Sequence, residues 1–388
     1  MAVIPYEEVL SAFRDHFQSE ITPAVYRAPG RVNLIGEHTD YNLGFVFPIA
    51  LEMACYCAIA PSGDDQLRVY SKDAGEEFVI PVQQIPGARP TGEWRDYVVG
   101  ISRELTKAGF AIEGANVYIS SQVPVGSGLS SSAALEISVA VTLLGERHMD
   151  RVEIAKLGQR SEIEFVGIPC GIMDQYAAVF GREGAAIQID CRSLTHEYVA
   201  LPRDVAIVAV NSLVQHELTT SAYRDRVAEC QAAVAAIQAI DPSVQSLRDV
   251  SMQYFVEIQE SVPPLPRQRA RHVISDSQRV LDLAAAARAH DIEEMGRLFV
   301  ASHRSMQFDY EISCEEIDFL VDTAIQIPGV YGARMTGGGF GGCTVNLVAP
   351  GATENFQEQL SRAYEERYGK TPPFYACVPA QGAGRVNL

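Results

Sequence analysis

The stretch VPVGSGLSSSAALE, residues 123–136, leads from a predicted strand into a predicted helix through a turn rich in glycine and serine. Residues 116–126 read as a strand, and the apolar residues after the turn recur at helical spacing as far as Gly145. Unpaired backbone N–H groups at the positive end of a helix bind phosphate without a lysine. The hydroxyls of Ser130, Ser131 and Ser132 can add contacts to phosphate or to a magnesium ion. Serine caps on an ordinary strand-to-helix loop give the same pattern, so this stretch alone leaves both interpretations open.

A second stretch, APGRVNLIGEHTDYN (28–42), combines an apolar face with a dense polar cluster. Val32 and Leu34 alternate as in an extended segment that is anchored in a core and then enters a turn at Gly36. Such a set of donors and acceptors suits a small polyhydroxylated ligand. The polar members of the cluster are Arg31, Asn33, Glu37, His38, Thr39, Asp40, Tyr41 and Asn42.

Residues 161–181, SEIEFVGIPCGIMDQYAAVFG, place Glu162 and Glu164 on a predicted helix that precedes a glycine-containing loop and Asp174. Apolar neighbours surround Asp174, so we expect its carboxylate to be half-buried. A buried carboxylate needs a partner, and an arginine is the best one, which makes Arg31 the candidate. Lysine is scarce in the chain and absent from these motifs, so the positive charge at such a site must come from other groups.

Short strands and helices are mixed in the first half of the chain, and long helices dominate after about residue 200. The proline-rich residues 261–268 are predicted to be a loop. The predicted strands, of which the first three suggest an antiparallel sheet, are 45–51, 53–59, 66–71, 116–126, 185–190 and 205–212. Further predicted helices are 151–166, 221–240, 269–289, 292–305 and 353–367. The pattern predicts an α+β protein of two domains, 1–200 and 201–388, joined near 195–205.

The composition favours a globular cytoplasmic protein. The net charge of −18 argues against nucleic acid or an anionic membrane as the main partner. The apolar run at 44–60 is broken by Pro48 and Glu52 and is too short to span a bilayer, and the first residues lack the basic region of a signal peptide. The eight cysteines form no paired CxxC motif, as expected for reduced, buried thiols.

Three further patterns do not carry the function they suggest. GKT at 369–371 is not a Walker loop, because Tyr364 stands where that loop needs its first glycine. GGGFGG (337–342) precedes a predicted strand rather than the helix of a dinucleotide-binding unit. HELTT (216–220) lacks the second histidine of a zinc protease.

Taken together, the motifs resemble those of the galactokinases, within the GHMP family of small-molecule kinases. GRVNLIGEHTDYN is similar to the galactokinase signature, VPVGSGLSSSAALE to the family's ATP loop, and MTGGGFGGCTVNLV (335–348) to its third motif. The resemblance extends over essentially the whole chain, through GEWRDYVVG, CGIMDQ, DCRSL, RHVI and DYEISC. It implies a two-domain GHMP kinase fold, with an N-terminal domain like domain 2 of ribosomal protein S5, a ferredoxin-like C-terminal domain and an active site in the cleft between them.

The resemblance also implies an activity: transfer of the γ-phosphoryl group of ATP to the anomeric hydroxyl of α-D-galactose. Asp174 matches the catalytic base and Arg31 its partner, a pair that can act more by orientation and electrostatics than as a strong base. Ser132 and Glu162 match the ligands of Mg²⁺. The positions that match sugar contacts are Glu37, His38, Thr39, Asp40, Gly171 and Tyr223. Those that match nucleotide contacts are Ser71, Trp94, Gly126, Ser127, Gly128, Leu129, Ser130, Ser131 and Ser132.

The sequence departs from the family pattern at a few positions. Gln215 and Val227 stand where arginines are common, and they could alter the packing around Tyr223 and so the sugar preference. Ala185 replaces a frequent histidine, and Ile163 replaces a usual polar residue beside Glu162.

Other functions are compatible with the same motifs. A related sugar 1-kinase could act on N-acetylgalactosamine or L-arabinose. A non-catalytic galactose sensor is also known in the family, but it lacks two residues after the serine run, and here Ala133, Ala134 and Asp174 are all present. An ATP-hydrolysing structural module would not need Glu37, His38 and Asp40. Many relatives are monomers, although the sequence does not determine the oligomeric state.

Overall fold

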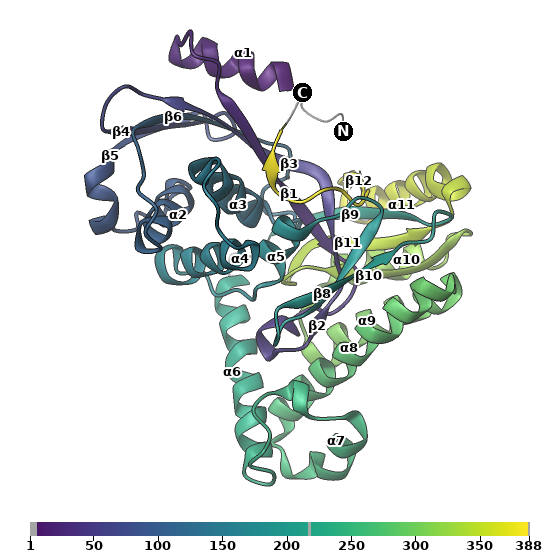
Figure 1. The fold of residues 1–388 in the computed structure, drawn as a ribbon. Coiled ribbons are helices and arrows are strands. Elements are labelled where there is room, and N and C mark those ends of the chain that lie inside the picture. Colours follow the sequence, from purple (N-terminus) through teal and green to yellow (C-terminus); the bar gives the residue numbers. More distant parts are fainter. Residues whose placement is uncertain (1–5, 216–218, 387–388) are drawn as a thin grey trace.

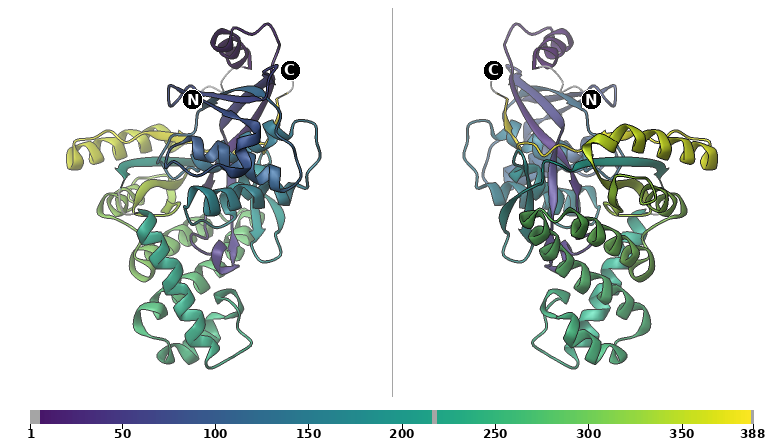
Figure 2. Two further views of the ribbon diagram at one scale, coloured as in Figure 1. Left: turned by 90° about the vertical axis from the view of Figure 1, so that its left-hand side faces the viewer. Right: turned by 90° about the vertical axis from the view of Figure 1, so that its right-hand side faces the viewer.

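The computed structural model describes residues 6–215 and 219–386. Residues 216–218 of the rejected HELTT motif lie outside this part, as do 1–5 and 387–388. The fold is mixed α+β, as predicted. Figures 1 and 2 show the sheets and their helices in one body, from which α6, α7 and one end of α8 project as a helical extension.

Within the described residues, the strands form three sheets. The strand orders are β13-β1-β3-β6-β4-β5, β10-β11-β9-β12 and β2-β7-β8. Their bounds are β1 Ala24–Asn33, β2 Phe45–Val46, β3 Pro48–Pro61, β4 Gln66–Ser71, β5 Glu76–Pro81, β6 Ala115–Ser121, β7 Ala185–Asp190, β8 Thr195–Ala200, β9 Ala206–Gln215, β10 Val330–Thr336, β11 Gly341–Val348, β12 Phe374–Ala376 and β13 Gly384–Arg385.

Helices cover the sheets and build the extension. The α-helices are α1 Tyr6–Phe17, α2 Arg95–Lys107, α3 Ser131–Leu144, α4 Arg151–Arg160, α5 Met173–Phe180, α6 Thr219–Gln238, α7 Met252–Ile258, α8 Pro264–Ala289, α9 Ile292–Ser305, α10 Glu315–Ala324 and α11 Thr353–Tyr368. Short 3₁₀ or π turns are η1 Asp40–Asn42, η2 Val82–Gly87, η3 Ser161–Val166, η4 Leu247–Asp249, η5 Gln259–Ser261, η6 Met306–Tyr310 and η7 Pro350–Ala352.

The first sheet differs from the prediction in two ways. The two strands predicted at 45–51 and 53–59 are mainly one long strand, β3, because Glu52, where the prediction placed the break, is simply an exposed position within a continuous strand. Pro48 stands at its first position, where the missing N–H breaks no interior pairing. β4 pairs antiparallel with β5 but parallel with β6, since the chain crosses over through α2 between them. The sheet is therefore mixed rather than antiparallel.

The start of one long helix was also predicted wrongly. α8 begins at Pro264, inside the predicted loop, because a proline in the first helical turn loses no hydrogen bond. The helix predicted at 151–166 has the predicted bounds, although its last 6 residues form the π turn η3 after α4. Helix α3 also ends before Gly145 as predicted, and Gly145 adopts a φ of 59° that suits glycine.

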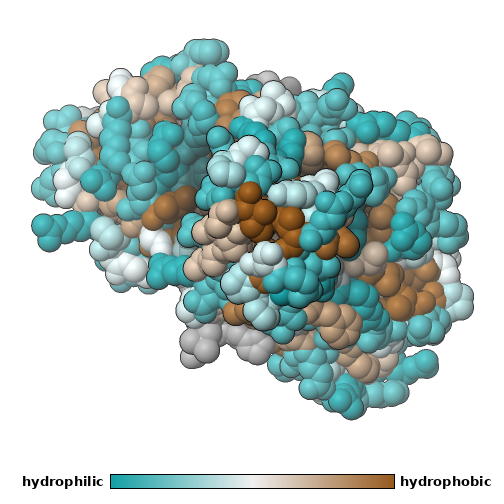
Figure 3. Space-filling model, turned by 90° about the horizontal axis from the view of Figure 1, so that it is seen from below, coloured by the Kyte–Doolittle hydropathy of each residue, from teal (hydrophilic) through white to brown (hydrophobic). Residues whose placement is uncertain are grey.

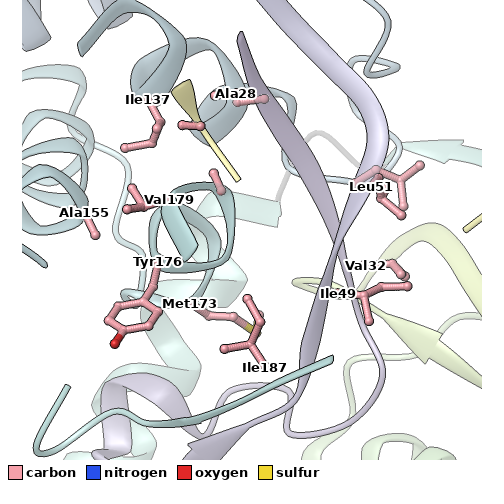
Figure 4. Packing of buried hydrophobic residues seen from close by; sticks show 14 of the residues in the cluster. Ala28, Val32, Ile49, Leu51, Ile137, Ala155, Met173, Tyr176, Val179 and Ile187 are labelled. Carbon is pink, nitrogen blue, oxygen red and sulfur yellow. The ribbon is translucent and has the colours of Figure 1, made fainter. Parts of the chain in front are cut away.

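The largest hydrophobic cluster joins the first sheet to α3, α4 and α5, and it also includes apolar residues of α8, α9 and β11. Figure 4 shows Ile137, Ala155, Tyr176 and Val179 of these helices in the same buried cluster as Ala28 of the first sheet. This packing brings the N-terminal ends of α3 and α5 close to the end of β1. The domain boundary at residue 200 stays a prediction.

The surface is largely polar. On the face shown in Figure 3, hydrophilic residues dominate and hydrophobic ones surface in a few separate groups. Across residues 6–215 and 219–386, we find no helix whose length and apolar character would allow it to cross a membrane.

Candidate active site

Arg31 connects β1 to the glycine–serine loop that precedes α3. Its backbone N–H donates to the Leu129 carbonyl at 3.1 Å, and its Nη1 donates to the Gly128 carbonyl at 2.6 Å. The strand can approach the loop this closely because a Cβ on Gly30 would stand only 2.6 Å from the Leu129 oxygen. The loop is thus fixed in front of α3, where unpaired N–H groups of the first helical turn are available.

The predicted pairing of Arg31 with Asp174 is present. Nε and Nη2 of Arg31 bond Oδ1 and Oδ2 of Asp174 at 2.8 and 2.6 Å, a bidentate geometry. Ser130 also donates to Oδ2, from a left-handed backbone conformation with a φ of 60°. The Asp174 side chain is 27% exposed, so it is half-buried as expected.

Two compartments meet at this pair. The larger, of about 430 Å³, is lined by the glycine–serine loop, and the smaller, of about 110 Å³, by the polar turn after β1. Both are lined by Arg31, Asp174, Tyr223 and Gly338. Two ligands that occupy the two compartments would therefore meet beside the Asp174 carboxylate.

The larger compartment contains most of the predicted phosphate-binding positions. Those that line it are Gly126, Gly128, Ser130, Ser131 and Ser132. Ser127 and Leu129 do not line it, because the Ser127 hydroxyl donates to the Pro124 carbonyl at 2.7 Å and the Leu129 side chain is buried in the core.

Asp40 is the least neutralised carboxylate of the smaller compartment. Its partners are the backbone N–H groups of Tyr41 and Met173, at 3.0 and 3.4 Å. Burial, together with the neighbouring Asp174, raises the pKa of Asp40 to about 6. Gly171 allows the loop to pass close by, since a Cβ there would overlap Asp40 Oδ2 at 1.6 Å. Asp40 is therefore well placed to accept hydrogen bonds from a ligand.

Glu37 and His38 also line the smaller compartment, but protein groups already bind their polar atoms. Glu37 forms an ion pair with the buried Arg334 and accepts from the Gly337 N–H at 3.1 Å. Nδ1 and Nε2 of His38 bond the Tyr41 hydroxyl at 2.8 Å and the Gly338 carbonyl at 3.1 Å. Burial lowers the pKa of His38 to about 3, so this imidazole is neutral.

Thr39 does not line either compartment. Its hydroxyl is within 2.9 Å of the Gly36 carbonyl and 2.6 Å of the Phe45 carbonyl, so it closes the turn. Tyr223, on α6, lines both compartments, and its ring centroid is 4.9 Å from that of His38. Of the two departures expected to affect Tyr223, the side chain of Gln215 lies outside the described residues, and the effect of Val227 stays a prediction.

Ser132 and Glu162, the predicted Mg²⁺ ligands, both line the larger compartment. Gln175 Nε2 bonds Oε2 of Glu162 at 2.6 Å and Oε2 of Glu136 at 3.0 Å. Burial and the nearby Asp174 raise the pKa of Glu162 to about 7. Such an excess of buried negative charge, lined by hard oxygen ligands, fits Mg²⁺.

The two oxygen ligands do not form a complete metal site by themselves. The part of the chain that the structure describes contains no group of three or more His, Cys, Asp and Glu side chains that could hold a metal. A Mg²⁺ ion here would take further ligands from phosphates and water, as is usual for this ion.

Ser71 and Trp94 line neither compartment, but the structure brings them into one neighbourhood. Ser71 pairs with Glu76 across β4 and β5, and Trp94 Nε1 donates to Glu76 Oε2 at 3.0 Å. Their predicted contact with the nucleotide stays a prediction.

Several lining residues were missed in the sequence. Tyr97 lines the larger compartment and lies within GEWRDYVVG, a motif of which only Trp94 was assigned to the site. Gly338 and Gly339 lie in the glycine-rich third motif, to which no site residue was assigned. Arg334, which lines neither compartment but pairs with Glu37, could not be found from the sequence either. The spacing of residues in a strand does not distinguish a buried arginine from an exposed one.

Three family profiles match the chain. They are described as "GHMP kinases N terminal domain" for residues 96–182, "GHMP kinases C terminal" for 283–366 and "Galactokinase galactose-binding signature" for 11–61. The crystal structure of the Methanococcus jannaschii mevalonate kinase shares the fold, with a TM-score of 0.65 and 18% identity over 94% of this chain and all of that one. Fold and site together define a GHMP-family kinase.

The more similar proteins are galactokinases. A galactokinase of Roseiflexus sp. is 46% identical over 98% of this chain and 97% of its own length. The crystal structure of Lactococcus lactis galactokinase complexed with galactose has a TM-score of 0.94 and 34% identity, covering 98% of this chain and 99% of that one. The chain belongs to the galactokinase family and is an ATP-dependent sugar kinase.

Proposed function

We propose that the chain transfers the γ-phosphoryl group of ATP to the C1 hydroxyl of α-D-galactose, giving galactose 1-phosphate and ADP. The observation that carries this proposal is the position of the Arg31–Asp174 pair at the junction of the two compartments. The larger compartment then holds the triphosphate, and the smaller one holds the sugar with its C1 hydroxyl next to Asp174.

Asp174 and Arg31 act together in this mechanism. Phosphoryl transfer depends on positioning and on neutralisation of charge rather than on covalent catalysis by the protein. The Asp174 carboxylate accepts the proton of the C1 hydroxyl as the new P–O bond forms. Arg31 orients that carboxylate and, since its Nη1 also bonds the Gly128 carbonyl, ties it to the loop that holds the phosphates.

The remaining positive field comes from backbone N–H groups and from Mg²⁺. Residues 126–132 and the first turn of α3 bind the triphosphate, as anions bind at helix N-termini. Ser132 and Glu162 would hold Mg²⁺, which neutralises charge on the phosphate oxygens when it is bound. Ser71 and Trp94 contact the nucleotide further from the point of transfer.

The sugar is recognised by the turn after β1 together with Gly171 and Tyr223. Asp40 accepts hydrogen bonds from sugar hydroxyls, whereas Glu37 and His38 form a rigid wall because their polar atoms already have protein partners. Thr39 stabilises the turn through the contacts of its hydroxyl with the Gly36 and Phe45 carbonyls. The enzyme acts as a cytoplasmic monomer with domains 1–200 and 201–388 and needs no nucleic acid or membrane partner.

The test is release of ADP with Mg-ATP against galactose, N-acetylgalactosamine, L-arabinose, glucose and mevalonate. We expect turnover with galactose that requires added Mg²⁺. Turnover with only N-acetylgalactosamine or arabinose would keep the mechanism and replace the substrate. Binding of galactose without ADP release would replace the proposal with a galactose sensor.

A further inference from the structure

A buried chain of hydrogen bonds links the helical extension to the wall of the sugar compartment. His38 Nε2 lies 3.1 Å from the Gly338 carbonyl, and Nδ1 lies 2.8 Å from the Tyr41 hydroxyl. The Tyr41 hydroxyl lies 2.7 Å from that of Tyr310, which in turn lies 3.1 Å from Cys230 Sγ. His38, Tyr310 and Cys230 are buried, and His38 and Gly338 line the compartment.

The chemistry of the members fixes the direction of every bond. A carbonyl can only accept, so Nε2 of His38 carries the proton and donates to Gly338. In a neutral imidazole the other nitrogen must then accept, so Tyr41 donates to Nδ1. The Tyr41 oxygen is left to accept from Tyr310, whose own oxygen accepts from the Cys230 thiol. A single arrangement of protons satisfies all four side chains.

The chain ends at a point that affects both compartments. Gly338 belongs to the glycine turn that follows β10 and leads into β11. In this turn Gly337 packs closely on the glycine–serine loop, since a Cβ on Gly337 would stand 3.2 Å from the Gly128 carbonyl oxygen. That same carbonyl accepts a bond from Arg31 at 2.6 Å. The position of the glycine turn is therefore coupled to the loop and to Arg31.

We propose that Tyr41 and Tyr310 are positioning residues, which act through His38 to hold the glycine turn where the sugar meets the transferred phosphoryl group. The identity of the ligand rests on the proposed function, whereas the chain and its proton arrangement do not. The two tyrosines contact no ligand in this proposal, since their hydroxyls are used within the chain.

The kinetic test compares Tyr41→Phe, Tyr310→Phe and Cys230→Ala with Tyr364→Phe. Tyr364 is the matched control, because its buried hydroxyl donates to the Ser212 carbonyl at 2.6 Å and lines neither compartment. We expect Tyr41→Phe to raise the galactose KM and lower kcat by roughly 10-fold each, since it leaves the buried Nδ1 of His38 without a donor. The ATP KM should rise less than the galactose KM, because the phosphate loop is also held by the bonds of Arg31 to the Gly128 and Leu129 carbonyls.

The effect should decrease with distance along the chain, from Tyr41 to Tyr310 to Cys230. A purely structural role would instead move the galactose KM of Tyr364→Phe as much as that of Tyr41→Phe. Equal effects in those two variants, or none in Tyr41→Phe and Tyr310→Phe, would overturn the proposal.

A spectroscopic test is independent of any activity. Long-range ¹H–¹⁵N correlation spectra of ¹⁵N-histidine-labelled protein, assigned with His38→Gln, should show His38 protonated at Nε2 alone. In Tyr41→Phe the Nδ1 resonance should shift, because its hydrogen-bond donor is gone. A proton on Nδ1 of His38 in the unsubstituted protein would refute the chain even if the enzyme phosphorylates galactose. The predicted tautomer would support it even if the substrate is a different sugar.

Discussion

Two arginine–carboxylate pairs involve the segment around the polar turn after β1, Arg31 with Asp174 and Arg334 with Glu37, and they differ in access to solvent. The side chains of Arg31 and Asp174 are 5% and 27% exposed, so the carboxylate opens toward the cavity. Those of Arg334 and Glu37 are 0% and 1% exposed, so the second pair is sealed. The chemistry of the pairs is alike, but only the Asp174 carboxylate has appreciable exposure to the cavity.

The partners of the sealed pair show that it stabilises the structure. Arg334 donates to the Leu34 carbonyl at 2.7 Å, and Glu37 accepts from the Thr336 hydroxyl at 3.3 Å. These bonds attach the turn after β1 to β10, three hundred residues later in the chain. The comparison indicates that burial of the carboxylate, rather than the type of partner, decides whether such a pair is open to a ligand.

The largest effect is expected from Asp174→Asn. The amide keeps an acceptor for Arg31 but cannot take up the proton of the sugar hydroxyl, so kcat should fall by roughly 10³-fold or more. Thermal unfolding should change little, because the side chain is partly hydrated. Steady-state ADP release and differential scanning fluorimetry measure the two quantities, with Asp64→Asn as a surface control. A stable variant with undiminished kcat would remove Asp174 from the mechanism.

Arg334→Met should have the opposite profile. It leaves Glu37 as a buried charge without its cation, which costs about 3–5 kcal/mol of unfolding free energy. Arg31→Met should cost less, because water from the cavity can solvate Asp174. Urea denaturation at pH 7.5 measures both variants. If the two losses of stability were equal, solvent access would not be what distinguishes the pairs.

A second substitution sharpens this result. Arg334→Met combined with Glu37→Leu removes both charges, and it should recover a large part of the stability lost in Arg334→Met alone. No recovery would mean that the bond from Arg334 to the Leu34 carbonyl, rather than the ion pair, carries the stability.

Much of the fold and the pairing of Arg31 with Asp174 could be predicted from the sequence because the signals are local. The helix from Ser131 to Leu144 has apolar spacing and a glycine stop, and Asp174 is an acid in an apolar context that demands a partner. The parallel pairing of β4 with β6 could not be predicted in this way, because it depends on the path of the chain through α2.

The polar turn shows where a local pattern is insufficient. Residues 37–40 look like one uniform set of ligand-binding groups, but the structure gives them different partners. Thr39 bonds the turn itself, Glu37 bonds an arginine that is remote in sequence, and Asp40 keeps its carboxylate toward the compartment. Which of them faces a ligand depends on contacts made by β10 and the glycine turn, and spacing does not encode those contacts.

Asp40→Asn tests whether a carboxylate kept for a ligand has a cost in stability. Its pKa is raised to about 6, so the folded protein binds a proton here more tightly than the unfolded chain, and the charge costs stability increasingly as the pH rises from about 4 to 6. We expect the variant to gain roughly 1–2 kcal/mol of unfolding free energy at pH 8. Its galactose KM should rise about 10- to 100-fold, through loss of a charged acceptor.

Urea denaturation and ADP-release kinetics measure the two effects. The stability gain should be smaller at pH 5 and should vanish only below about pH 4, where Asp40 is protonated in the unfolded chain as well. A variant that loses stability at pH 8 while the galactose KM is unchanged would mean that Asp40 is a structural residue like Glu37.

The smallest effect concerns the pH dependence of stability. His38 has a pKa of about 3 in the folded protein, lowered by burial, against an ordinary value near 6.5 in the unfolded chain. Between these values the unfolded chain binds a proton that the folded protein does not, so stability is complete above about pH 6.5 and is lost as the pH falls, by roughly 1.4 kcal/mol per pH unit. His38→Gln keeps a donor for Gly338 and an acceptor for Tyr41 but does not titrate. Urea midpoints measured from pH 7 to pH 5 should therefore decline less steeply than in the wild type, because about one proton fewer is taken up on unfolding.

His148→Gln, at an exposed histidine, is the control and should leave the wild-type slope unchanged. Equal slopes in the two variants would mean that His38 can be protonated in the folded protein. The wall of the smaller compartment at His38 would then be able to admit water, as the cavity already does at the partly exposed Asp174 carboxylate.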